Sequence, residues 1–177
     1  LTNGDAGHQS QGGGALARRR RAEALEAGRR LGVEYEVLDN HDAELMPTLE
    51  VRHQVIRKIR EWDADIVLGL RPNDYHPDHR NAGLIALEAI FPAADNPMFY
   101  PEMADEGYHP HKVSQLYVFG HSQPNVKFDI TDDINTKIQA ILCHVTQIDD
   151  PENAPQRWLE RWGEVQPDGS KRYFEQF

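Results

Sequence analysis

The sequence feature that most constrains the fold is an apolar stretch followed, after a short polar turn, by a helical pattern. Residues 64–70 have the composition of a buried strand, and residues 80–90 have the spacing of a helix. Four titratable side chains lie in the turn between them: Asp74, His76, Asp78 and His79. Ligands of open α/β sheets bind at the carboxyl ends of strands, where this turn falls. Imidazole and carboxylate groups at this spacing can bind a metal ion or transfer protons.

The same turn also has a purely structural interpretation. Asp78 would be the N-cap of the following helix, Pro77 would stiffen the entry, and both histidines would be solvated loop residues. Four titratable groups within six residues favour the functional interpretation. The turn is therefore a candidate site, with the helix cap as the alternative.

Strands and helices alternate along the first half of the chain. Residues 15–31 and 49–62 place apolar side chains at helical spacing, and residues 35–38 have the character of a short strand. Alternation of this kind predicts parallel strands joined by right-handed crossovers. We expect an α/β fold: a three-layer, Rossmann-like domain with a mainly parallel sheet, formed as a single domain by residues 1–177.

Residues 91–112 interrupt the alternation with several aromatic side chains and four prolines, Pro92, Pro97, Pro101 and Pro110. A loop of this length in a compact domain is usually functional or disordered. Its aromatic residues suit a lid that faces a sugar, and equally a hydrophobic flap over the core or an oligomer contact. The sequence leaves these interpretations open.

A second strand end follows this loop. Residues 113–119 have the pattern of a strand, and the loop after it carries His121, which is therefore a further site candidate. The next helix is expected to run to about residue 148, with Thr131 or Asp132 as its N-cap. The aromatic-rich tail, residues 149–177, is expected to pack on the core or on a partner subunit.

Composition narrows the class of protein. The net charge of −10 argues against a nucleic-acid partner, because phosphate binding needs a basic face. No apolar run reaches the length of a membrane span. Cys143 is the single cysteine, which excludes an internal disulfide framework and a cysteine-rich zinc site. We expect a soluble protein, and the cytoplasm is its default compartment.

Arg20 lies on the apolar stripe of the first predicted helix, where an unpaired charge is costly. Glu23, three residues later, is the expected partner. Four consecutive arginines at 18–21 also oppose the helix macrodipole, so we expect an anionic neighbour. Arg20 is assigned a buried support or substrate-side role, and the other three arginines are expected to be solvated.

Five motifs occur in a consistent order along residues 1–148. They are Thr-Asn-Gly-Asp-Ala-Gly at 2–7, Arg-x-x-Glu at 20–23, His-Pro-Asp-His at 76–79, Asp-Ile-Thr at 129–131 with Lys137, and His-x-Thr-Gln at 144–147. This series resembles the motifs of the PIG-L/LmbE family of zinc-dependent N-acetylglucosaminyl deacetylases. The resemblance implies the same α/β fold.

One motif of that family is absent from this sequence. The family opens with a strand ending in Ala-His-Pro-Asp-Asp-Glu, which supplies a histidine and an aspartate to the metal and a second aspartate as general base. Leu1 corresponds to the end of the family's second strand, and a strand–helix–strand unit needs about 30 residues or more. We therefore expect an N-terminally truncated domain that lacks the first strand and helix and holds part of a metal site.

The resemblance implies a role for each titratable residue of the turn. His79 is the third protein ligand of one zinc ion per chain. His76, as an imidazolium, stabilises the oxyanion and protonates the leaving amine. Asp78 orients His76, and Asp74 shapes the loop or holds a histidine. The supporting or substrate-side candidates are Arg20, Glu23, His121 and His144.

The implied reaction is hydrolysis of an N-acetyl group on an N-acetylglucosamine-type sugar conjugate, a small molecule, which releases acetate and a free amine. The alternative belongs to a different class. With two ligands and the base absent, the chain would be a non-catalytic homologue that binds a sugar or assembles with a partner. A homo-oligomer is compatible with either. The sequence does not identify the substrate, and histidine and carboxylate ligands suit zinc, iron and cobalt alike.

Overall fold

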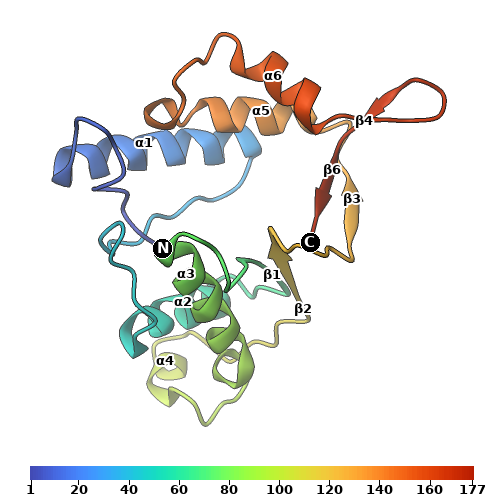
Figure 1. The fold of residues 1–177 in the computed structure, drawn as a ribbon. Helices are drawn as coiled ribbons and strands as arrows, with labels where there is room; N and C mark the ends of the chain where they lie inside the picture. The colour runs from blue at the N-terminus through green and yellow to red at the C-terminus, as the bar shows by residue number, and fades with distance from the viewer. The chain divides into compact units, whose positions relative to one another are not determined.

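The computed structural model describes residues 1–177 except for the side chains of residues 91–93, so the side chain of Pro92 in the aromatic loop lies outside the described part. The chain forms two compact units. The first comprises Leu1–Ala43 and Asn125–Gln176, and the second comprises Glu44–Pro124 and Phe177. Figure 1 shows the elements of both.

The second unit is built on one pair of parallel strands. β1 (Ile66–Leu70) pairs with β2 (Gln115–Phe119), with Ile66 opposite Gln115 and Leu70 opposite Phe119. The helices of this unit are α2 (Leu49–Glu61), α3 (Pro77–Glu88), the π-helix η1 (Ala89–Ala94) and α4 (Pro101–Asp105). The α/β fold class and the parallel pairing expected from the sequence are confirmed.

Helix α3 packs tightly against the end of β1. Gly83 makes this approach possible, because a Cβ at that position would lie 2.4 Å from the carbonyl oxygen of Leu70. Ile85, fully buried on the same helix, packs with Leu45 and Val51. The turn that joins β1 to α3 is thereby held between two packed elements.

The predicted loop at 91–112 is partly helical, because it contains α4 and the end of η1. Tyr100, Met103 and Tyr108 pack against the buried core of this unit. The guanidinium of Arg60, 3% exposed, donates to backbone carbonyl oxygens of the same segment. These contacts support the interpretation of this segment as a flap over the core.

The first unit pairs helix α1 (Gly13–Leu31) with helix α5 (Ile134–Leu142), which lie side by side (Figure 1). Its strands are β3 (Lys127–Asp129), β4 (Glu164–Val165), β5 (Lys171–Arg172) and β6 (Phe174–Gln176). β3 pairs with β6 and β4 with β5, both antiparallel. The aromatic tail thus contributes three strands and helix α6 (Ala154–Trp162), on which Trp158 and Trp162 stack 5.5 Å apart.

The strand expected at 35–38 does not form. In the described chain, the one β contact of this region is a parallel bridge between Thr2 and Asn40. A strand is defined by hydrogen bonds to a neighbouring strand, which alternation of side chains alone cannot supply. The prediction from local pattern is therefore wrong here.

The limits of α5 also differ from the expectation. The helix ends at Leu142 rather than near residue 148, and its N-cap is Asp133 rather than Thr131 or Asp132. Asp129 explains the later start, because its Oδ1 accepts from the amide and the hydroxyl of Thr131 at 2.9 and 2.6 Å and fixes a turn there. A 3-10 turn, η2 (Val145–Gln147), follows in place of the helix's expected end.

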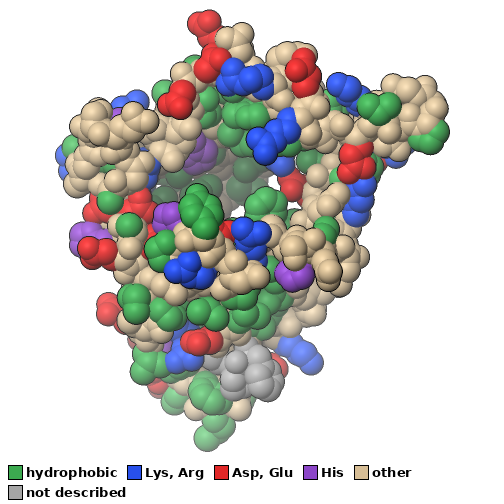
Figure 2. Space-filling view, in the orientation of Figure 1, with side chains coloured by type: hydrophobic (Ala, Val, Ile, Leu, Met, Phe, Trp, Pro, Cys, Tyr) green, Lys and Arg blue, Asp and Glu red, His purple; other side chains and the backbone are tan. Residues whose placement is uncertain are grey.

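No helix of the described residues is both long enough and apolar enough to cross a membrane. On the face shown in Figure 2, charged side chains of both signs lie between hydrophobic ones. Several large apolar side chains are exposed, among them Leu68 at 64% and Tyr75 at 85%. Tyr75 belongs to the candidate turn, so its exposure bears on the site.

Candidate active site

The turn between β1 and α3 is fixed by hydrogen bonds within it. His76 is the N-cap of α3, because its Nδ1 accepts from the backbone amide of Asp78 at 3.2 Å. The interpretation of Asp78 as the N-cap is therefore wrong: α3 begins at Pro77, so Asp78 is already the second residue of the helix. Proline suits this first helical position, where a missing N–H leaves no hydrogen bond unmade.

Asp74 ties together three parts of the turn. Its Oδ1 accepts from the backbone amide of His76 at 3.0 Å and lies 3.3 Å from Nδ1 of His79. Its Oδ2 accepts from Nε of Arg71 at 3.0 Å. The hydrogen bond from the His76 amide, with the Arg71 charge adding to it, holds the pKa of Asp74 below its ordinary value. Asp74 is thus an anion at neutral pH that both shapes the turn and contacts a histidine.

The two histidines of the turn differ in the group that faces Nδ1 of each ring. Their rings stack with centroids 4.6 Å apart and planes inclined by 25°. His76 uses Nδ1 as an acceptor, so its ring proton lies on Nε2. Nδ1 of His79 lies 3.3 Å from Oδ1 of Asp74, and in the neutral tautomer with its proton on Nδ1 this ring has a lone pair on Nε2. In these tautomers one ring offers a hydrogen-bond donor and the other a nitrogen lone pair.

Asp78 is 6% exposed and holds two neighbours. Its backbone amide donates to His76, and its Oδ1 accepts from the backbone amide of Leu45 at 3.1 Å. Asn81 donates to the carbonyl oxygen of Leu45 at 2.6 Å. Asp78 and Asn81 together fasten the segment before α2 to the start of α3. That the carboxylate of Asp78 orients His76 stays a prediction, because the contact with His76 given above comes from the backbone amide of Asp78 and not from its side chain.

Arg71, which the sequence analysis did not single out, connects two strand ends. Its Nη1 donates to the carbonyl oxygen of Gly120 at 2.6 Å while its Nε holds Asp74. His121 follows in the exposed exit loop of β2, where its Nδ1 accepts from the amide of Gln123 at 3.1 Å. A cation directly after an apolar strand is the sequence signal that marks Arg71, although β1 itself is partly exposed.

In the first unit, Arg20 organises the loop that precedes α1. Its Nη1 donates to the carbonyl oxygen of Gly4 at 2.9 Å and pairs with Asp42 at 3.2 Å, and its Nη2 donates to the carbonyl oxygen of Gly7. Gly4 has a φ of 72°, and a Cβ there would lie 2.6 Å from Cδ of Arg20. Asp42 is the anionic neighbour that the arginine cluster predicts.

Glu23 is not the partner of Arg20 that the sequence predicts. Its carboxylate accepts from the amide and the hydroxyl of Thr146 at 3.1 and 2.7 Å, and it lies 3.4 Å from Nε of Arg19. The two side chains diverge from α1, one toward the preceding loop and the other toward η2. Glu23 therefore binds η2, and with it the neighbouring His144, to α1.

Replacing Arg20 by lysine should loosen this loop. Lysine keeps the charge but has one nitrogen where the guanidinium contacts Gly4, Gly7 and Asp42. We expect the free energy of unfolding in urea to fall by about 1–3 kcal/mol. Amides of the loop should also exchange faster with deuterium. Arg21→Lys, on the exposed side of α1, is the matched control and should cost less than about 0.5 kcal/mol. If Arg20→Lys and Arg21→Lys lower the free energy of unfolding equally, the assignment of Arg20 as the residue that holds this loop would be contradicted.

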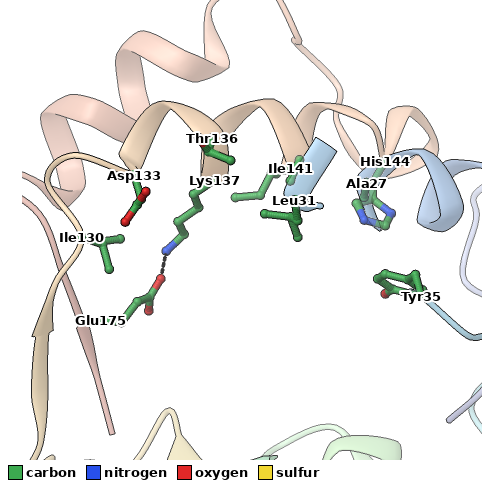
Figure 3. Close-up of a pocket in the computed structure, with 11 residues that line it drawn as sticks. Ala27, Leu31, Tyr35, Ile130, Asp133, Thr136, Lys137, Ile141, His144 and Glu175 are labelled. Atoms are coloured by element: carbon green, nitrogen blue, oxygen red, sulfur yellow. Dashed lines mark hydrogen bonds and ion pairs between the residues drawn. The ribbon is translucent and has the colours of Figure 1, made fainter. Parts of the chain in front are cut away.

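The described residues of the first unit line at least two pockets. One, of about 220 Å³, is lined by Arg20, Glu23, Asp42, His144 and Thr146 among others. The second, of about 490 Å³, is mainly apolar (Figure 3). Leu31 and Ile141 lie in its middle, the Lys137–Glu175 ion pair at one end, and Tyr35 and His144 at the other. His144 lines both pockets.

The described residues do not complete a metal site. Among them, no group of three or more histidine, cysteine, aspartate or glutamate side chains is placed to hold a metal ion. His41 meets Asp5 at 2.8 Å, which makes a pair rather than a cluster. His79, whose Nδ1 lies 3.3 Å from Oδ1 of Asp74, is the residue of this turn that the sequence predicts as a metal ligand. A zinc site with three protein ligands needs two more.

The structure brings the predicted site residues together in two groups, one in each unit. The second unit holds Asp74, His76, Asp78 and His79 on one turn, with His121 at the neighbouring strand end. The first unit holds Arg20, Glu23 and His144 around one pocket. These features define an α/β protein whose candidate site is a histidine–carboxylate turn at the carboxyl end of a parallel strand.

The chain belongs to the PIG-L family, described as GlcNAc-PI de-N-acetylase, which it matches over residues 1–90. A curated relative, the diacetylchitobiose deacetylase of Thermococcus kodakarensis, is 34% identical over 150 residues. That match covers 82% of this chain and 55% of the relative, so the chain spans little more than half the relative's length.

The solved structures that are similar to this chain include two that are informative here. The N,N'-diacetylchitobiose deacetylase from Pyrococcus horikoshii superposes with a TM-score of 0.83 at 31% identity, covering 99% of this chain and 69% of that one. The conserved protein TT1542 from Thermus thermophilus gives a TM-score of 0.72 at 24% identity, covering 99% and 78%. The second likeness concerns the fold alone.

Proposed function

We propose that this protein is a metal-dependent N-deacetylase that hydrolyses the N-acetyl group of an N-acetylglucosamine-type sugar. Membership of the PIG-L family and the similarity to two diacetylchitobiose deacetylases support the reaction and make a small acetylated oligosaccharide the proposed substrate class. The products are acetate and a free amine on the sugar. A cytoplasmic location and a homo-oligomer stay predictions from the sequence.

The observation that carries the proposal is that the two stacked histidines have different partners at Nδ1. Nδ1 of His76 accepts from a backbone amide, and Nδ1 of His79 lies next to the carboxylate of Asp74. Amide hydrolysis needs a hydrogen-bond donor for the oxygen that becomes negative in the transition state. It also needs an activated water and a polarised carbonyl, which a metal ion can provide. We propose that Nε2–H of His76 meets the first need, and that a neutral His79 meets the second through the lone pair on its Nε2.

His79 is proposed as one ligand of a single zinc ion. Asp74 holds its Nδ1, and Arg71 in turn holds Asp74. Zinc, when bound, supplies an activated water and polarises the substrate carbonyl. The other ligands and the general base are proposed to come from residues outside this turn.

His76 is proposed to donate from Nε2–H to the substrate carbonyl oxygen as that oxygen gains negative charge. Protonation of the leaving amine by His76 stays a prediction with a structural consequence. In the imidazolium, Nδ1 also carries a proton and cannot accept the hydrogen bond from the amide of Asp78. The N-cap of α3 would therefore have to open for that step.

Arg20 and Glu23 are proposed as supporting residues, because their contacts are with the loop before α1 and with η2. His144 is proposed as a substrate-side residue, because it lines both pockets of the first unit. His121 is proposed as substrate-side because it lies in the exposed exit loop of β2.

The second candidate is a non-catalytic homologue that binds a sugar or assembles with a partner. The observation in its favour is that the described residues contain no group of three or more histidine, cysteine, aspartate or glutamate side chains placed to hold a metal ion. In this case the family fold would be kept without the hydrolytic step.

Acetate release from diacetylchitobiose by the purified protein, with bound metal measured in parallel, separates the two candidates. For the deacetylase we expect one zinc per chain. Acetate release should be lost on chelation and restored by added zinc. Sugar binding without acetate release, in excess zinc, would support the non-catalytic homologue instead.

A further inference from the structure

Tyr75 is 85% exposed although it lies in the middle of the candidate site, between Asp74 and His76. Its ring is edge-on to His76, with centroids 6.1 Å apart and planes at 82°. It is also edge-on to His79, at 6.3 Å and 73°. The proposed chemistry uses both imidazoles and leaves this ring without a role.

The backbone that carries the ring is held by several hydrogen bonds. Nη1 of Arg80 donates to the carbonyl oxygen of Asp74 at 2.7 Å and to that of Tyr75 at 3.0 Å. The amide of His76 donates to the side chain of Asp74 at 3.0 Å. The turn therefore presents an exposed aromatic side chain from a fixed backbone, which lowers the ordering cost of a contact made there.

We propose that Tyr75 is a substrate-contacting residue whose ring packs on the C–H face of a pyranose ring held beside His76 and His79. This inference rests on the proposed deacetylase function and names the residue that recognises the sugar ring. Tyrosine suits the task, since its ring offers a large rigid apolar face with few torsion angles. Covering the ring with a sugar also removes apolar surface from water.

A contact with another protein is the competing explanation, because exposed apolar side chains also mark interfaces. The edge contacts of Tyr75 with both imidazoles favour the substrate, since they place the ring beside the groups assigned to the reaction. A ligand bound to those groups would meet this ring.

The test compares Tyr75→Ala and Tyr75→Phe in the intact protein loaded with zinc. The control is Trp62→Ala, which removes a half-exposed aromatic side chain at the C-cap of α2. With diacetylchitobiose as the probe, Tyr75→Ala should raise KM about tenfold and leave kcat within about twofold, the pattern of lost ground-state binding. Tyr75→Phe and Trp62→Ala should have KM and kcat values close to those of the parent protein.

Other outcomes separate this inference from the proposed function. Unchanged KM in Tyr75→Ala, or a changed oligomeric mass with unchanged KM, would overturn the inference and leave the deacetylase proposal standing. If the parent protein releases no acetate, calorimetric titration with the same sugar decides. Binding that Tyr75→Ala weakens and Trp62→Ala does not would support the inference without the enzyme. No binding by the parent protein would overturn both.

Discussion

Replacing His79 by alanine should remove the bound metal and the deacetylase activity together. The ring of His79 has Nδ1 directed at Asp74, which leaves Nε2 as the coordinating nitrogen. A zinc site with three protein ligands loses much of its affinity with any one of them. Elemental analysis of the purified variant should find well under one zinc per chain, and acetate release should fall to the background rate.

Two further variants make this result interpretable. His109→Ala removes an exposed histidine of the same unit and should keep both metal and activity. Asp74→Asn leaves His79 in place but weakens the group that orients it, so metal affinity should fall about 10–100-fold while activity returns at high zinc. Stoichiometric zinc in His79→Ala would show that the ligand lies elsewhere.

The parts of the fold that the sequence predicts well are those determined by local interactions. β1 and α3 follow from an apolar run and a helical period, although α3 begins at Pro77, three residues before the start expected at residue 80. The segment 35–38 is different. It alternates as a strand does, yet forms none, because a strand depends on a neighbour that local pattern cannot supply.

The candidate site likewise has features that the sequence predicts and features that only the structure reveals. Spacing alone places His76 and His79 on one turn. The partner of Arg20 cannot be read from helical spacing, since Asp42 lies 22 residues away and Glu23 only three. The protonation pattern of the two imidazoles is equally hidden in the sequence, because it depends on which atom faces each Nδ1.

His76 has two functions that a single substitution would confuse. Its Nδ1 caps α3 by accepting from the amide of Asp78, and its Nε2–H is the proposed donor to the developing oxyanion. An alanine at this position removes both. Because α3 also carries His79, a loss of activity after loss of the cap could arise from a shifted ligand.

His76→Asn and His76→Ala should separate the two functions. Both remove the imidazole and should lower kcat by about 10²–10⁴-fold with zinc still bound. Asparagine is a favoured N-cap, and its side-chain oxygen can accept from the amide of Asp78. The free energy of unfolding of His76→Asn should therefore be close to that of the parent protein, while that of His76→Ala should be lower by about 1 kcal/mol. Urea unfolding, elemental analysis and acetate release on the same samples provide the comparison. If His76→Asn recovers full activity, His76 is a helix cap alone. If His76→Asn loses its zinc, the roles of His76 and His79 are reversed.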